Sequence, residues 1–318
     1  MKLQQLRYLV EVAKQGLNVS LAAEKLHTSQ PGISKQIRLL EDELGVQIFI
    51  RNGKRVVDVT PPGREILRIA EQMLMQARNL KQIGEEFVNV EGGSLTIATT
   101  HTQARYALPP VVHAFLEKYP KVSLSIKQGS PTQISEMVVE GQADIAIATE
   151  GIDHYSELAM LSCYDWNRCI VVTSGHPLPR LGRPITLADV AAYPLITYDF
   201  AFAGRSKINR AFADAGLEPN VVLTAIDSDV IKTYVGLGLG IGILASMAFE
   251  PERDLGLEAI DASHLFEKST THIGIRKDAY LRGYAYDFIE LFAPHLTRQV
   301  VQNALLCAAD EDMASDDE

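Results

Sequence analysis

The sequence predicts a helical head with a two-stranded hairpin, then a long linker helix, then an α/β domain made of two similar halves. Three observations lead to this fold class. Apolar residues recur at helical spacing over residues 3–44. A single apolar stripe continues over residues 62–89. From residue 95 onward, short apolar strands alternate with helical segments, a pattern typical of parallel sheets.

The composition excludes several classes of protein. The chain has 318 residues, of which 47% are hydrophobic, so it can bury real cores and is neither disordered nor fibrous. Its length predicts about two domains. Its three cysteines form no Cys-x-x-Cys pair, which argues against a disulfide scaffold and a metal site. No apolar run reaches the roughly 20 residues of a membrane helix. We therefore expect a cytoplasmic protein that does not act at a membrane.

Charge is distributed unevenly along the chain. The net charge is −10, but residues 1–68 hold 11 Lys/Arg and 7 Asp/Glu, a local balance of +4. A uniformly basic nucleic-acid coat protein is therefore excluded, whereas a local basic domain is not. The last 16 residues, 303–318, contain two acidic runs, and we expect this tail to be disordered.

The head begins with three predicted helices. Residues 3–13 give the first amphipathic helix, and Ser20 is placed to cap the second. The third starts near Gln30 and Pro31, because a proline in the first turn removes no helical hydrogen bond. Its apolar stripe runs to Leu44 and the helix ends at a glycine.

The second and third helices, joined by a short turn, fit a helix-turn-helix, in which the later helix enters the major groove of DNA. Short polar or cationic side chains, which reach base edges and phosphates, are predicted on its outer face or N-terminus: Thr28, Ser29, Gln30, Ser34, Lys35 and Arg38. Ser20 and Pro31 complete this part of the predicted DNA-binding set. The alternative is a helical cap with no nucleic-acid role.

A hairpin follows the third helix. Residues 46–50 and 56–59 read as strands, and the Asn-Gly pair between them is a strong turn signal. Its tip carries Arg51, Lys54 and Arg55, which suit a wing over phosphates or the minor groove. Residues 1–60 are thus predicted to form a winged helix-turn-helix domain.

Residues 61–92 are predicted to be a linker that ends in a hinge. Thr60 can cap a helix over 62–89, whose one apolar face either packs on the head or pairs with a second copy of the chain, and pairing is favoured. A dimer would place two reading heads on two half-sites.

Residues 93–302 read as two α/β halves, 93–163 plus 268–302 and 164–267. The first half has strands predicted at 95–100, 122–127 and 143–148, with helices at 108–119 and 131–140. The second has strands at 169–172, 194–197, 221–225 and 240–244, with helices at 206–215 and 229–235. A strand at 271–276 and a helix at 279–291 are expected to return to the first half.

The strand ends predict a ligand site in the cleft between the halves. Ligands of open α/β sheets sit at the carboxyl ends of strands, and helix N-termini there favour anions. Hydroxyl and amide side chains occupy these positions: Thr100, Thr102, Gln103, Ser130 and Thr149. Helix capping is the alternative explanation for each of them taken singly.

Enzyme motifs are absent. The sequence has no Gly-x-Ser-x-Gly elbow and no His-Glu-x-x-His. The alternating glycines of 236–242 follow a predicted helix and precede a strand, the reverse of a dinucleotide loop. We expect no catalytic residues and no cofactor.

The head resembles LysR-type transcriptional regulators. The motifs that carry the resemblance are Ser20-x-x-Ala23, Thr28-Ser29-Gln30-Pro31-x-Ile33-Ser34, Leu40-Glu41-x-x-Leu44-Gly45-x-x-Ile48-Phe49-x-Arg51 and Thr60-Pro61-x-Gly63. Within that family the chain resembles the CysB-type regulators of sulfur assimilation, through 98–109, 128–133, 147–150, 166–168, 229–235 and 292–298.

The resemblance implies a homotetrameric activator, a dimer of dimers, that binds promoter double-stranded DNA and RNA polymerase. It also implies a periplasmic-binding-protein-like effector domain made of two Rossmann-like subdomains. The implied effector is sulfate, N-acetylserine, O-acetylserine or a related sulfur metabolite, and the implied contacts are Thr100, Thr102, Gln103 and Thr149.

One implied effector position differs from the family pattern. A family threonine falls on Ala203, and Asp199 adds a negative charge nearby. A neutral hydrogen bond is worth roughly 0.5–1.5 kcal/mol, so weaker sulfate binding or another ligand is expected. Three alternatives stay open: a regulator of sulfonate or taurine utilisation, a constitutive repressor with a vestigial pocket, and an α/β enzyme.

Overall fold

The structure is a computed structural model of the whole chain, and it describes residues 1–315 except 54, 89–91, 150–154 and 200–204. The side chains of residues 85, 88 and 308–315 lie outside this description. The chain divides into two units, Met1–Phe87 and Val88–Glu318, which are considered separately. Among the described residues, no helix is long and apolar enough to cross a membrane.

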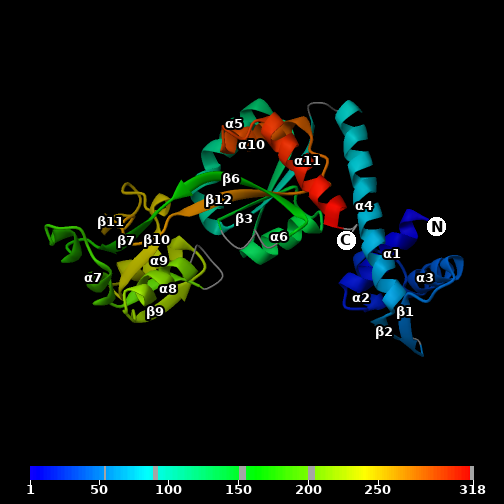
Figure 1. Cartoon of the computed structure of the whole chain (residues 1–318), viewed down its shortest axis with the longest axis horizontal. Coiled ribbons are helices and arrows are strands. Elements are labelled where there is room, and N and C mark those ends of the chain that lie inside the picture. The colour runs from blue at the N-terminus through cyan, green and yellow to red at the C-terminus, as the bar shows by residue number, and fades with distance from the viewer. Residues whose placement is uncertain (54, 89–91, 150–154, 200–204, 316–318) are drawn as a thin grey trace. The chain divides into compact units, whose positions relative to one another are not determined.

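The first unit is a three-helix head with a hairpin and a long helix (Figure 1). Its elements in order are α1 (Leu3–Lys14), α2 (Val19–Lys25), α3 (Gln30–Leu44), β1 (Phe49–Asn52), β2 (Arg55–Val59) and α4 (Pro61–Val88). β1 and β2 pair in antiparallel fashion. This arrangement is a winged helix-turn-helix followed by a linker helix.

Local signals in the sequence explain where these helices begin and end. The second helix is present as predicted, but Ser20 does not cap it: the cap is Asn18, whose Oδ1 accepts hydrogen bonds from the backbone N–H groups of Ser20 at 3.1 Å and Leu21 at 3.2 Å. Ser29 caps α3, and Gly45 ends it with φ +71°, a conformation that favours glycine.

The apolar stripes form the core of the head. Leu9, Val12, Ile33 and Leu40 are fully buried between α1, α2 and α3. Leu44, which the predicted stripe included, is 41% exposed, because α3 extends beyond the packed helices there.

α4 starts against the hairpin. The Thr60 hydroxyl accepts the backbone N–H of Gly63 at 3.0 Å and donates to the Gln47 carbonyl at 2.6 Å. A Cβ on Gly63 would lie 2.2 Å from the carbonyl oxygen of Ile48, so only glycine fits this approach. Further along α4, Ala70 is buried against the head, whereas Leu80 is 71% exposed.

The second unit contains two five-stranded sheets, each the centre of a lobe. Lobe I, residues 92–166 and 269–315, has the strand order β4-β3-β5-β12-β6. Its elements are β3 (Gly92–Thr99), the π-helix η1 (Gln103–Ala107), α5 (Leu108–Lys118), β4 (Lys121–Gln128), α6 (Pro131–Val139), β5 (Ile145–Ala148), β6 (Leu158–Trp166), β12 (Ser269–Arg276), α10 (Gly283–Phe292) and α11 (Arg298–Ser315).

Lobe II, residues 168–261, has the strand order β11-β7-β10-β8-β9. Its elements are β7 (Arg168–Thr173), η2 (Leu178–Arg180), α7 (Leu187–Ala191), β8 (Leu195–Tyr198), α8 (Arg205–Asp214), β9 (Val221–Ala225), α9 (Ser228–Gly236), β10 (Ile241–Ala245), η3 (Ser246–Ala248) and β11 (Leu257–Asp261).

The chain crosses between the lobes twice, from β6 to β7 and from β11 to β12 (Figure 1). β12 therefore lies in the sheet of lobe I, paired antiparallel with β5 and β6. β6, β11, α7 and α11 were not predicted from the sequence. The expectation of a disordered tail from residue 303 is also corrected, because α11 continues to Ser315 and its Leu305 packs on the lobe I core.

Candidate DNA-binding surface and effector site

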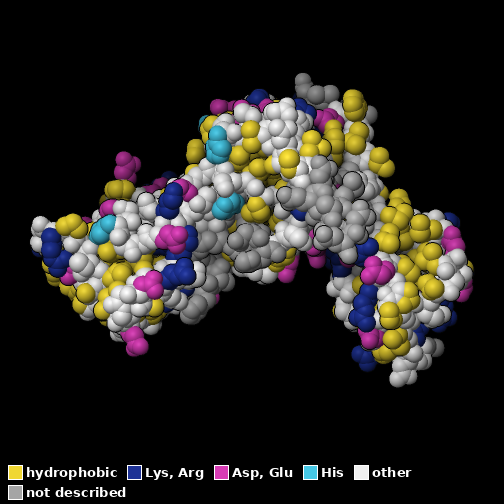
Figure 2. Space-filling view, in the orientation of Figure 1, with side chains coloured by type: hydrophobic (Ala, Val, Ile, Leu, Met, Phe, Trp, Pro, Cys, Tyr) yellow, Lys and Arg dark blue, Asp and Glu magenta, His cyan; other side chains and the backbone are white. Residues whose placement is uncertain are grey.

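The outer face of α3 forms a groove in the first unit. It is lined by Gln30, Pro31, Ser34, Lys35, Arg38 and Leu39. Lys35 and Arg38 are exposed, and the Gln30 side-chain amide donates to the Ser34 hydroxyl at 3.2 Å. Five residues of the predicted DNA-binding set thus share one surface. Figure 2 shows Lys and Arg side chains on the exposed face of this unit.

A second hollow joins three parts of the head. Its lining comes from residues 15–20, from Gln30 at the start of α3, and from Arg55 and Val56 of β2. The structure therefore brings Ser20, Gln30 and Arg55 to one depression, although 35 positions separate the first from the last. Thr28 and Ser29 lie exposed beside the N-terminus of α3. Lys54 falls outside the described residues.

Arg51 has a structural partner that the sequence did not predict. Its Nη2 lies 2.8 Å from Oε2 of Glu41, a carboxylate that is 3% exposed within α3. Oε1 of Glu41 also accepts the backbone N–H groups of Ile48 at 2.9 Å and Phe49 at 3.1 Å. Glu41 therefore fastens the hairpin to α3, and Arg51 completes that anchor. The only sequence signal was a glutamate on the otherwise apolar side of α3.

The predicted effector residues gather where β3 and β5 end. Thr100 follows β3, Thr102 directly precedes η1, and Gln103 begins it; Thr102 and Gln103 are 9% and 1% exposed. Thr149 follows β5 and is 8% exposed. β3 and β5 are parallel neighbours, so their carboxyl ends place these side chains at one edge of the lobe I sheet.

The side chain of Gln103 is held on both sides. Its Nε2 donates to the Thr271 hydroxyl at 3.1 Å, and its Oε1 accepts the Tyr164 hydroxyl. Both contacts join η1 to β12 and β6. The Gln103 side chain therefore fixes the position of η1 at the site, since its two ends already have partners within the protein.

Thr149 and Thr102, the two threonines near Gln103, have different environments. The Thr149 hydroxyl accepts the indole N–H of Trp166 at 3.2 Å, which leaves its own proton to donate. Thr102 is 9% exposed, and the phenol of Tyr198, at the end of β8 in lobe II, hydrogen-bonds the Ser228 hydroxyl at 2.6 Å. Burial raises the pKa of that phenol, so Tyr198 stays neutral and keeps its proton. The site thus offers neutral hydroxyl donors, which suit an anion or a carboxylate.

Ser130 caps α6. Its hydroxyl accepts the Gln133 backbone N–H at 3.3 Å, and the Gln133 side chain accepts the Ser130 N–H at 2.9 Å. This capping box accounts for Ser130 without a ligand. Ala203 falls outside the described residues.

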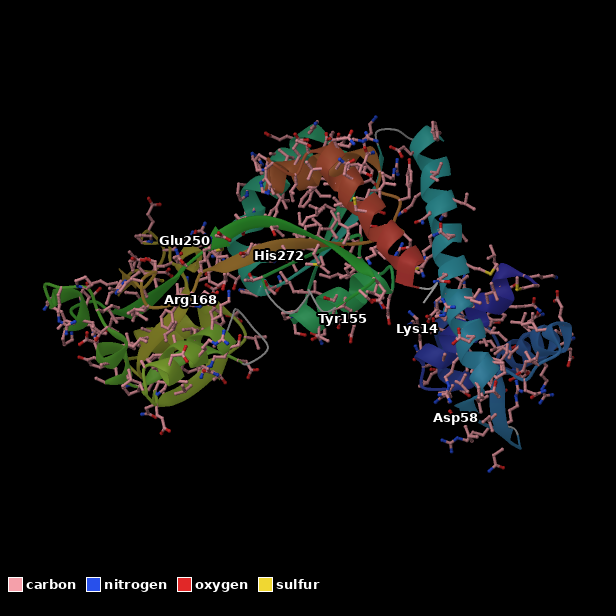
Figure 3. The ribbon with its side chains drawn as sticks, viewed as in Figure 1. Lys14, Asp58, Tyr155, Arg168, Glu250 and His272 are labelled. Carbon is pink, nitrogen blue, oxygen red and sulfur yellow. The ribbon has the colours of Figure 1, made fainter. Side chains whose placement is uncertain are left out.

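Arg168 fixes the crossing between the lobes, where Figure 3 labels it. Its side chain is 1% exposed and donates to the Glu267 carbonyl and to the Ser269 hydroxyl, each at 2.9 Å. The guanidinium also lies 5.0 Å from the centre of the Trp166 ring. Because Trp166 holds Thr149, the crossing and the effector edge share one set of contacts.

One group of described side chains has the spacing of a metal site. Donor atoms of His101, Asp227 and Asp229 lie within 4.8 Å of one another. The Lys232 ammonium, however, lies 3.4 Å from Asp229, and the Arg105 guanidinium lies 3.7 Å from it. Protein cations already balance this carboxylate, so the group does not favour a metal ion.

The comparisons with known proteins agree with both units. Residues 3–64 match the model of bacterial regulatory helix-turn-helix proteins of the lysR family, and residues 89–297 match the LysR substrate binding domain. Over 305 residues the chain is 54% identical to the regulator CysB of Burkholderia cenocepacia, covering 96% of this chain and 97% of that protein. It is 52% identical to the regulator SsuR of the same species over 306 residues, covering 96% and 99%.

Solved structures give the same result. The cofactor-binding domain of the Cbl regulator superposes with a TM-score of 0.65 at 42% identity, covering 67% of this chain and 93% of that one. Full-length CbnR in complex with its target DNA superposes with a TM-score of 0.60 over 93% of this chain and all of that one. At 21% identity, the second likeness concerns the fold alone.

A winged helix-turn-helix joined to a two-lobed ligand-binding domain defines a DNA-binding regulator. The chain belongs to the LysR family of transcriptional regulators. The relatives named above are regulators and not enzymes, which agrees with the absence of enzyme motifs from the sequence.

Proposed function

We propose that this LysR-family regulator mainly activates genes of sulfur assimilation and cysteine biosynthesis, under control of a small sulfur metabolite. The observation that supports this most is the combination of 54% identity to CysB with the hydroxyl donors at the strand ends of lobe I. The effector class we infer is sulfate, N-acetylserine, O-acetylserine or a related compound. Thr100, Thr102 and Thr149 are proposed to contact it.

The chemistry of the site fits an acceptor ligand. Thr149 accepts from Trp166, so its own hydroxyl proton can be donated to a ligand. Neutral donors and backbone N–H groups stabilise an anion without burying a second charge against it. The ligand would bias the relative orientation of the lobes, and the regulator would respond through a shift in population.

Calorimetric titration of the full chain tests the effector assignment. The probes are sulfate, thiosulfate, O-acetylserine, N-acetylserine and adenosine phosphosulfate, each repeated with Thr149→Ala. We expect sulfate or an acetylserine to bind and the variant to lose that binding. Binding that is unchanged in Thr149→Ala would refute the assigned site.

A second candidate is control of sulfonate or taurine utilisation genes. Ala203 favours it, because the CysB-type pattern has a threonine there and alanine lacks the hydroxyl. Tight binding of only the nucleotide-linked probe in the same titration would support this candidate over the first.

For DNA, we propose that residues 28–38 read the major groove and that the hairpin contacts phosphates. Lys35→Ala and Arg55→Ala should each weaken binding in a gel-shift series and reduce the salt slope by about 1 for each phosphate that the variant no longer neutralises. Lys14→Ala, on α1 outside both hollows, is the control. Unchanged affinity and salt slope in Lys35→Ala and Arg55→Ala would exclude these contacts.

We further propose that the chain works in the cytoplasm as a dimer of dimers that engages RNA polymerase at promoters. The exposed apolar side chains of α4, among them Ile69, Met73 and Leu80, support self-pairing along this helix. Sedimentation equilibrium of the full chain should give a tetramer. Leu80→Glu should shift it to smaller species.

A further inference from the structure

A polar cluster joins the lobes beside the effector residues. From lobe I come His101 and, within η1, Arg105 and Tyr106; from lobe II come Asp229 and Lys232, both in α9. The Tyr106 hydroxyl donates to Oδ1 of Asp229 at 2.6 Å, and the His101 ring lies 3.2 Å from Oδ2. One carboxylate of lobe II thus binds three side chains of lobe I.

Tyr106 is also anchored by its ring. It packs on the lobe II core formed by β7, β8, β10 and α9, although it belongs to lobe I. The Lys232 ammonium lies 5.1 Å from the ring centre and donates to the Tyr106 hydroxyl at 2.9 Å. Tyr106 is therefore a lobe I side chain seated in lobe II.

Lys232 is the buried member of the cluster. It is only 7% exposed, and its ammonium donates to the Ala248 carbonyl at 2.8 Å and to the Asp254 carboxylate at 3.0 Å as well as to Tyr106. Its three protons thus have three acceptors. A buried ammonium is stable only with such partners, so Lys232 holds the Tyr106 hydroxyl in one place.

The ionisation states agree with this geometry. Burial would raise the pKa of Asp229, but hydrogen bonds from Tyr106 and His101 and the nearby Lys232 lower it below its usual value. Burial and the bond to Asp229 raise the pKa of Tyr106. At neutral pH the carboxylate is charged and the phenol keeps its proton, as the hydrogen bond requires.

The cluster and the effector residues lie on one short segment of backbone. Residues 100–103 carry three of the predicted effector side chains, and Tyr106 lies three residues after Gln103, in the π-helix that Gln103 begins. A π-helix widens the backbone by one residue per turn and often marks a functional site. Tyr106 therefore connects lobe II to the short backbone segment that carries Thr102 and Gln103.

We propose that Tyr106, Asp229 and Lys232 form an interlobe clasp whose members are positioning residues for the effector site. The clasp holds η1 of lobe I against α9 of lobe II, and so it sets effector affinity without contacting the effector. This inference rests on the proposed effector site for its affinity readout, but lobe coupling itself is measurable without any ligand.

The chain contains a matched control. In lobe I, the Tyr119 hydroxyl donates to Asp287 at 2.6 Å, and Lys118 pairs with the same carboxylate. This Tyr-Asp-Lys group joins α5 to α10 within one lobe. Tyr119→Phe removes the same chemistry as Tyr106→Phe without touching the lobe junction.

Trp166 reports on the junction because it is the only tryptophan of the chain, is 7% exposed and directly precedes the crossing into lobe II. In the ligand-free full-length protein, Tyr106→Phe and Asp229→Ala should increase acrylamide quenching of Trp166. They should also weaken binding of sulfate or N-acetylserine by roughly 5-fold or more. Tyr119→Phe should change neither quantity, although all three variants lose a hydrogen bond.

The clasp would be overturned if acrylamide quenched Trp166 equally in Tyr106→Phe, Asp229→Ala and Tyr119→Phe. Increased quenching with unchanged affinity would overturn its positioning role. If the wild-type protein binds neither probe, the proposed effector is wrong, and the quenching comparison still decides whether the clasp exists.

Discussion

Replacing Glu41 with alanine would test how the wing is held on the helix-turn-helix. The carboxylate is 3% exposed and accepts two backbone N–H groups, from Ile48 and Phe49, in addition to its ion pair with Arg51. Alanine would leave both N–H groups and a guanidinium without this acceptor. Removing one partner of a buried ion pair costs about 3–5 kcal/mol.

Glu41→Gln gives a graded comparison. The amide oxygen still accepts the two N–H groups but without charge, so each bond falls from roughly 1.5–3 to roughly 0.5–1.5 kcal/mol. We expect a loss of about 1–3 kcal/mol, smaller than for alanine. Asp42→Ala, an exposed position on the same helix, is the control and should lie within about 0.5 kcal/mol of wild type.

Amide hydrogen exchange of the full chain measures this locally. If the amides of Ile48 and Phe49 exchange through opening of the wing, a loss of about 3 kcal/mol speeds their exchange by roughly 100-fold, since about 1.4 kcal/mol is tenfold. Gel shifts on the same variants should show weaker DNA binding, because Arg55 loses its fixed position. Wild-type exchange at residues 48 and 49 in Glu41→Ala would refute the anchoring argument.

Three further predictions concern the second unit. Phe115 is fully buried among aromatic rings, so Phe115→Ala should lower stability by about 3–5 kcal/mol, measured as a reduced denaturation midpoint. Burial raises the pKa of the Cys163 and Cys169 thiols to about 12, so at pH 8 only exposed Cys307 should react with a thiol reagent until the protein is unfolded. Burial and a neighbouring carboxylate raise the pKa of Tyr119 to about 12. The protonated Tyr119 phenol stabilises the fold below about pH 10, and this contribution is lost as the pH rises toward 12. The free energy of unfolding should therefore fall less steeply with alkaline pH in Tyr119→Phe.

Much of the fold follows from local sequence. Helices of the head are encoded by apolar spacing, and Asn-Gly at residues 52–53 predicts the hairpin that the structure has between β1 and β2. The strands of both halves follow from short apolar runs. The misses include the helices α7 and α11 and the strands β6 and β11, and the pairing partners of these two strands lie more than 80 residues away in sequence.

The candidate site also has features that follow from local sequence and features that depend on packing. The sequence itself determined which donors lie at strand ends, because a strand that stops before Thr100 or Thr149 must present them at the sheet edge. Only the tertiary structure decided what those side chains do. Gln103 is bound at both ends by residues of β6 and β12, and Ser130 is a helix cap.

The interlobe contacts show why the roles of these polar side chains depend on the tertiary structure. Tyr106 and Asp229 are 123 residues apart, and a phenol gains a charged acceptor there only because the two lobes meet at that point. Hydrophobic periodicity is a property of neighbouring residues and can be read from the chain. The pairing of buried polar groups depends on distances of about 3 Å between remote side chains, and packing alone sets those distances.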